Sequence, residues 1–79
     1  REREELLRSV TAAVLELDAP QRRVVMMRYF DGLAPREIAL ALRVEPNVVS
    51  TRLTRAHHKL RERLERQFGR QRAWALLAW

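Results

Sequence analysis

The 79-residue chain contains no cysteine, only two glycines and only three prolines. Without cysteine it can form no disulfide and no thiolate metal site, so packing alone must stabilise what is a small core at this length. No apolar run approaches the roughly 18 to 20 residues of a membrane-spanning helix, and the arginine-rich start lacks the apolar segment of a signal peptide. These absences favour a soluble cytoplasmic domain. A start without Met and an end within an apolar run indicate a piece of a longer protein.

The residue patterns of an active site are also missing. There is no glycine-rich phosphate loop and no spaced cluster of histidine with carboxylates, and a helical unit of this size has little room for a shielded pocket. His57 and His58 are adjacent, so a helix turns them about 100° apart, and no third metal ligand stands near them. We therefore expect no enzyme activity, cofactor, metal site or small-molecule substrate.

Positive charge is concentrated in the second half of the chain. Residues 1–42 carry seven arginines and seven acids, whereas residues 43–79 carry nine Arg or Lys against three Glu. The whole net charge of +6 thus lies after Leu42. Such asymmetry is typical of a domain that binds a polyanion, because each neutralised phosphate releases condensed counterions. A solvated basic helix would give the same charge pattern.

Apolar residues recur at helical spacing in four segments, and no segment alternates as a strand does. The segments are residues 4–17, 18–30, 35–42 and 46–68. Asp18 is expected to cap the second helix, with Pro20 in its first turn, and prolines 35 and 46 to open the last two. We predict an all-α domain of four helices without a wing over residues 1–69. An apolar tail with space for one short helix follows over residues 70–79.

The second helix has one predicted core face. Val24, Met27 and Phe30 share a side at helical spacing, and both Met26 and Met27 are expected to fill the core.

The third and fourth helices, separated by residues 43–45, match a helix-turn-helix whose second helix enters the major groove. On the fourth helix a core stripe is predicted for Val49, Leu53, Ala56, Leu60 and Leu64. The opposite arc carries Asn47, Thr51, Thr54 and His58, flanked by Ser50 and Arg55. No acid occurs between Pro46 and Lys59, although an ordinary surface helix would carry some. This face is therefore predicted to bind DNA.

Residue chemistry divides the predicted contacts into two groups. Thr54 and Arg55 are the best candidates for base edges, supported by Asn47, Ser50 and Thr51 near the start of the helix. The candidates for phosphate contact are Arg52, His58 and Lys59. For Arg52, a pair with an acid such as Glu37 is the alternative.

The run from Leu17 to Leu64 resembles region 4 of the sigma-70 family of bacterial sigma factors, particularly the extracytoplasmic-function group. Family members typically read LRYFEGLSYEEIA and later TVKSRLHRARKKLRE, and this chain reads MRYFDGLAPREIA and VVSTRLTRAHHKLRE at the same separation. The resemblance covers 48 of the 79 residues.

The resemblance implies that the fourth helix recognises the minus-35 promoter element while the β-subunit flap of RNA polymerase core holds the domain. It places base and backbone contacts on Glu45, Val48, Ser50, Thr51, Thr54 and Arg55, and a phosphate contact on Arg28. The roles of Glu45, Val48 and Arg28 rest on the resemblance alone. An acidic anti-sigma factor is a further partner to consider. The alternative functions are a dimeric helix-turn-helix regulator and a module whose main partner is an anti-sigma protein.

Three departures from the family pattern affect the turn and the fourth helix. Arg43 stands where many such motifs place glycine to accept a left-handed backbone. Pro46-Asn47 replaces a small-residue opening, and Ser50 stands where Lys or Arg is common, which leaves the promoter sequence open. For residues 70–79 two readings remain. The tail folds back on the domain or is the cut edge of a C-terminal extension, or else its Trp and Leu side chains dock a partner, a second copy or a membrane-proximal segment.

Overall fold

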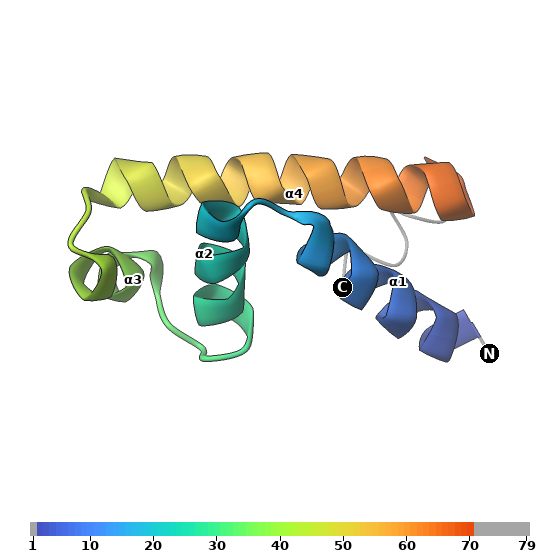
Figure 1. Ribbon diagram of the computed structural model, residues 1–79, viewed down its shortest axis with the longest axis horizontal. Coiled ribbons are helices and arrows are strands. Elements are labelled where there is room, and N and C mark those ends of the chain that lie inside the picture. Colours follow the sequence, from blue (N-terminus) through green and yellow to red (C-terminus); the bar gives the residue numbers. More distant parts are fainter. Residues whose placement is uncertain (1, 71–79) are drawn as a thin grey trace.

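The computed structural model describes residues 2–70, and all four predicted helices are present in it (Figure 1). They are α1 (Glu2–Glu16), α2 (Ala19–Tyr29), α3 (Pro35–Leu42) and α4 (Pro46–Phe68). Every regular element within this range is a helix. None of the helices described is both long and apolar enough to cross a membrane. The two readings of the tail concern residues that lie almost entirely outside the described range.

Local signals in the sequence explain where the helices begin and end. Asp18 caps α2, because its Oδ1 accepts a hydrogen bond of 2.9 Å from the backbone N of Gln21. At the start of α3, the backbone N of Ala34 donates to Glu37 Oε1 at 2.7 Å. Prolines 20, 35 and 46 each occupy the first turn of a helix, where the missing N–H has no helical acceptor. The starts of α2, α3 and α4 are thus built as predicted.

Helix α4 forms the long axis of the molecule, and the other three helices lie along one side of it (Figure 1). The described chain measures 39 × 22 × 19 Å. Side chains from all four helices meet in the core, whose fully buried members include Val24, Ile38, Val49 and Ala56. Because α1, α2 and α3 all pack against the same side of α4, the opposite side of α4 is left to solvent.

The burial of α2 differs from the predicted pattern. Phe30 is 72% exposed, because α2 ends at Tyr29 and the amides of Phe30 and Asp31 both turn back to the Met26 carbonyl. Met26 is also exposed, whereas Met27 is half-buried against the core as expected. The core-facing residues of α2 are Val24, Val25 and Gln21. Placing Phe30 and Met26 in the core was therefore wrong.

Candidate nucleic-acid interface

The turn between α3 and α4 is closed by a left-handed residue. Arg43 has φ 58° and ψ 46°, so an arginine here adopts the left-handed backbone for which many such motifs use glycine. Its backbone N donates to the Leu40 carbonyl at 3.3 Å, and that of Val44 donates to the Ala39 carbonyl at 3.1 Å. These bonds satisfy the last carbonyls of α3 and turn the chain directly into α4. The result is a helix-turn-helix with a three-residue connection.

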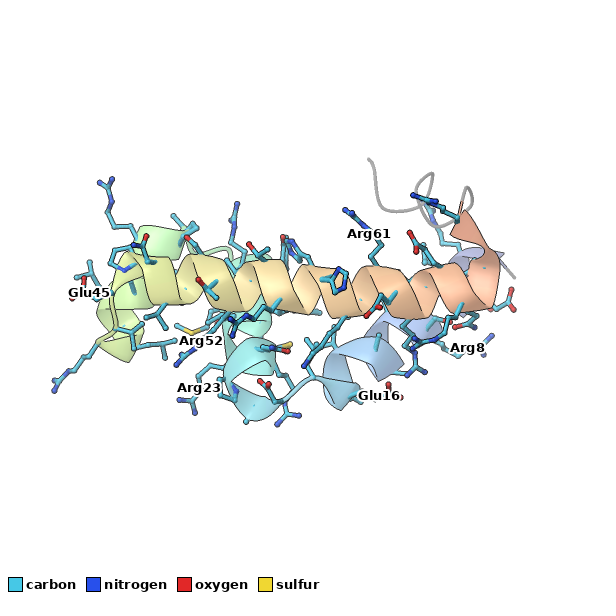
Figure 2. All side chains as sticks on the ribbon, turned by 90° about the horizontal axis from the view of Figure 1, so that it is seen from above. Arg8, Glu16, Arg23, Glu45, Arg52 and Arg61 are labelled. Atoms are coloured by element: carbon cyan, nitrogen blue, oxygen red, sulfur yellow. The ribbon has the colours of Figure 1, made fainter. Side chains whose placement is uncertain are left out.

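The outer face of α4, defined as the side turned away from the other three helices, is exposed. Figure 2 views the molecule from this side, and no other helix crosses in front of α4. Val49, Leu53 and Ala56 point the opposite way and are buried. The structure brings six predicted DNA-contacting residues together as exposed side chains on or beside this face: Asn47, Ser50, Thr51, Thr54, Arg55 and His58.

Glu45 and Val48 lie at the N-terminal end of this face. Glu45 occupies the N-cap position of α4, and its carbonyl accepts a hydrogen bond of 3.0 Å from the backbone N of Val48. The Glu45 side chain is exposed and makes no capping hydrogen bond. Val48 is half-buried. Both side chains thus stand where α4 would first meet a ligand, and their contact with DNA stays a prediction.

One flank of α4 faces α1 and the start of α2, and its cations are paired with acids. Lys59 Nζ lies 3.9 Å from Asp18 Oδ2, and Arg63 forms an ion pair with Glu16. The hydrogen bond from Arg63 lowers the pKa of the Glu16 carboxyl below its usual value. A phosphate contact by Lys59 would therefore have to compete with Asp18.

Arg52 and His58, two other predicted phosphate contacts, have different surroundings. Arg52 is half-buried on the same flank as Lys59, and Glu37, its proposed partner, instead bonds the Ala34 amide. His58 Nε2 lies 3.7 Å from Glu62 Oε1, one turn along α4, and both side chains are exposed. His58 therefore remains accessible on the outer face.

Arg28, near the end of α2, connects the helix to the following loop. Its Nη1 donates to the Leu33 carbonyl at 3.3 Å, and its guanidinium carbon lies 5.8 Å from the ring centroid of Tyr29. The side chain is half-buried. Arg28 thus has a structural partner in the free protein, and its phosphate contact stays a prediction.

A contact that the sequence did not reveal joins the end of α2 to the middle of α4. Tyr29 Oη lies 2.6 Å from His57 Nε2, and the two ring centroids are 5.5 Å apart at an interplanar angle of 44°. Partial burial, followed by the nearby Arg61 charge, lowers the pKa of His57 below its usual value. The two residues are 28 positions apart in the chain, so helical periodicity alone could not pair them.

An open groove of about 610 Å³ lies beside the paired flank of α4. Its apolar lining includes Leu15, Pro20, Met26, Leu42 and Val44. Three arginines, Arg22, Arg23 and Arg52, also line it, and Figure 2 shows Arg23 and Arg52 on the same side of α4. The groove was not predicted from the sequence, because it is assembled from all four helices and the turn after α3. It combines apolar and basic chemistry.

Three core-packed helices that support an exposed helix after a tight turn define the protein as a helix-turn-helix domain. Residues 7–60 match the family model described as Sigma-70, region 4, which covers more than half of the chain. The chain therefore belongs to the sigma-70 region 4 family and has the DNA-binding role of a sigma factor module. Searches of curated proteins and of solved structures gave no significant match.

Proposed function

We propose that the outer face of α4 recognises the minus-35 element of a promoter and that the domain, acting in the cytoplasm, supports transcription initiation. The observation that carries this proposal is the exposure of short polar side chains and Arg55 on a helix with no acid from Pro46 to Lys59. A helix about 10 to 12 Å wide fits a major groove about 12 Å wide. Short hydroxyl and amide side chains can then hydrogen-bond base edges without holding the helix away from them.

In this mechanism the protein positions other molecules and does no chemistry. Basic side chains dock the phosphates, Thr54 and Arg55 contact base edges, and Asn47, Ser50 and Thr51 support them near the start of α4. Arg52, His58, Lys59 and Arg28 remain the proposed phosphate contacts. For Lys59 the phosphate replaces Asp18 as partner, so its net contribution is smaller than that of a cation without such a partner.

The matched test compares Arg55→Ala with Lys59→Ala in the complete 79-residue chain. Duplexes selected from a random pool by the wild-type protein are titrated, together with every single base-pair change, by fluorescence anisotropy. Arg55→Ala should cost about 1 to 3 kcal/mol on the selected duplex and relax preference at one base pair, whereas Lys59→Ala should weaken all duplexes alike. Equal, sequence-blind losses for both variants would show that Arg55 does not read a base.

Footprint length on the selected duplex separates two classes of DNA-binding protein. A sigma factor module protects one site as a monomer. A dimeric regulator would protect two half-sites about one helical turn apart. Protection of paired half-sites would overturn the sigma factor mechanism in favour of the regulator.

RNA polymerase docking is assigned in this proposal to the groove beside α4. Its apolar lining and its three arginines suit a partner segment that is both apolar and acidic, and we propose that the β-subunit flap supplies this segment. An acidic anti-sigma protein would compete for the same surface. Leu15 lines the groove and is 65% exposed, whereas Leu7 lies two turns earlier on α1, is 62% exposed and does not line it.

Those two leucines provide a matched pair of variants. Leu15→Asp should weaken binding of the purified flap, measured by calorimetry, because it places a charge in the apolar part of the groove. Leu7→Asp should bind the flap as wild type does. The groove assignment fails if both variants bind the flap equally well.

A further inference from the structure

The Tyr29–His57 pair has one hydrogen-bond donor that the contact between the two side chains does not use. When His57 is neutral, the two side chains carry two polar protons, one on the phenol and one on the imidazole. Only one of them is used in the 2.6 Å hydrogen bond between Tyr29 Oη and His57 Nε2. If the phenol donates, the other ring nitrogen of His57 keeps its N–H; if His57 Nε2 donates, the phenol keeps its O–H. In both tautomers one donor remains for an external acceptor.

The pair lies next to the proposed DNA-reading surface. Ser50, His57 and Arg61 are spaced seven and four residues apart, so at about 100° per residue they form one stripe along the edge of the outer face. Figure 2 shows Arg61 directed away from α4 on the side opposite Arg52. All three side chains are exposed, and so is Tyr29 of α2. This stripe is therefore the second flank of α4, across the helix from Lys59 and Arg63.

A helix that occupies the major groove has a flank toward each strand, because its width nearly equals that of the groove. We propose that Tyr29, His57 and Arg61 form a phosphate-binding site that docks this second flank of α4 on the DNA backbone. Arg61 supplies the positive charge, and the Tyr29–His57 pair supplies a donor held in place from two helices. The site rests on the proposed function, since it requires α4 to enter the groove.

The groups around the pair fit an anion. On α4 the neighbouring charge is the Arg61 guanidinium, which together with burial lowers the pKa of His57. On α2 the neighbours are the Tyr29 phenol and the Arg28 guanidinium beyond its ring. A phosphate brought to this site adds a negative charge that counteracts Arg61 and favours protonated His57. DNA binding through the site should therefore be accompanied by proton uptake at His57.

Three variants of the complete chain test the site against a duplex chosen for tight binding. Tyr29→Phe and His57→Ala should each weaken binding about fivefold to tenfold on every sequence, because each removes either the donor to the phosphate or the partner that holds this donor in place. Tyr29→Phe should leave the salt dependence unchanged. Arg61→Ala should reduce the slope of log affinity against log salt by about 1, as expected for one phosphate contact. Arg8→Ala is the control, since it removes the same charge from the exposed surface of α1 (Figure 2).

Nuclear magnetic resonance of the imidazole nitrogens measures the pKa of His57. DNA would not change this pKa if the Tyr29–His57 pair only stabilised the fold. The pKa of His57 should be higher in the presence of the duplex than in a titration of the free protein at the same ionic strength. Circular dichroism confirms that each variant is folded.

The outcomes separate the two proposals. If the wild type binds no duplex, the proposed function itself fails. If it binds but Tyr29→Phe and His57→Ala bind equally well and the His57 pKa stays constant, the phosphate site is wrong while the function of α4 stands. Loss of affinity confined to particular base pairs would also overturn the site, because a phosphate contact carries no base preference.

Discussion

Asp18 contacts Lys59 across the junction of three helices: its Oδ2 lies 3.9 Å from the Lys59 Nζ on α4. Its other oxygen, Oδ1, accepts the hydrogen bond from the Gln21 backbone that caps α2. One carboxylate thus caps α2 and also pairs with Lys59, a cation that was predicted from the sequence to contact a DNA phosphate. Since both side chains of the ion pair are about half exposed, the cap is expected to stabilise the fold more than the ion pair does.

Two substitutions at Asp18 separate these roles. Asp18→Ala removes the cap and the ion pair and should lower the free energy of unfolding by about 1 kcal/mol, within the usual range for an N-cap. Asp18→Asn keeps a capping oxygen and loses only the charge, so it should change stability by less than about 0.5 kcal/mol. Urea denaturation followed by circular dichroism measures both. Equal losses would mean that the ion pair with Lys59 is the stronger contact.

Arg43 gives a prediction about backbone strain. A residue with a side chain in the left-handed region costs about 1 to 2 kcal/mol, whereas glycine adopts it freely but loses more entropy on folding. Arg43→Gly should therefore raise the free energy of unfolding by about 0.5 to 1 kcal/mol. Arg43→Ala is the matched control, because it removes the same charge and retains the strain. The explanation is wrong if alanine stabilises the domain as much as glycine.

Helix boundaries and the core side of α4 were predictable because their causes are local. Asp18, Pro35 and Pro46 act within one turn of the helix they begin, and periodicity alone separates Val49 and Leu53 from the outer face. The sequence marked Arg43 as a departure from the usual glycine, and only the structure shows that it adopts the left-handed backbone. Family membership then gave the DNA-binding role, which the charge distribution alone left ambiguous.

The contacts between helices could not be read from the sequence. Tyr29 meets His57 and Asp18 meets Lys59 only because α2 packs across α4, and a helical wheel says nothing about that crossing. The same limitation applies to Phe30, which shares a stripe with Val24 but lies beyond the last turn of α2. The groove beside α4 depends on the packing of several segments and has no sequence signature.

Gln21 is a buried amide with an unsatisfied oxygen. The side chain is 7% exposed, and no hydrogen-bond donor in the described part of the chain reaches its Oε1. An unpaired buried polar atom costs about 1 to 3 kcal/mol. Gln21→Met, which preserves the shape of the side chain, should therefore raise the free energy of unfolding by about 1 kcal/mol. Gln21→Ala should lower the free energy of unfolding, because the smaller side chain leaves a cavity. Thermal denaturation of the two variants shows whether polarity or volume dominates at this position.

Two groups give the stability of the domain a pH dependence in separate windows. The pKa of His57 is lowered in the folded state, mainly by burial and then by Arg61, so the unfolded chain takes up a proton first as the pH falls below about 6.5. Stability that is present above that pH is lost as the pH falls through the folded pKa. The pKa of Glu16 is also lowered, by its hydrogen bond with Arg63, so its contribution is present above about 4.5 and is lost in more acidic solution.

Urea unfolding at a series of pH values between about 7.5 and 3.5 should resolve these two contributions. His57→Gln should flatten the decline that begins near pH 6.5 while leaving the more acidic decline in place. Glu16→Gln should do the reverse, because its partner Arg63 stays charged throughout. A wild-type profile that is level between about pH 7 and 5.5 would show that His57 has the same pKa in the folded and unfolded chains, and would contradict its partial burial against Tyr29.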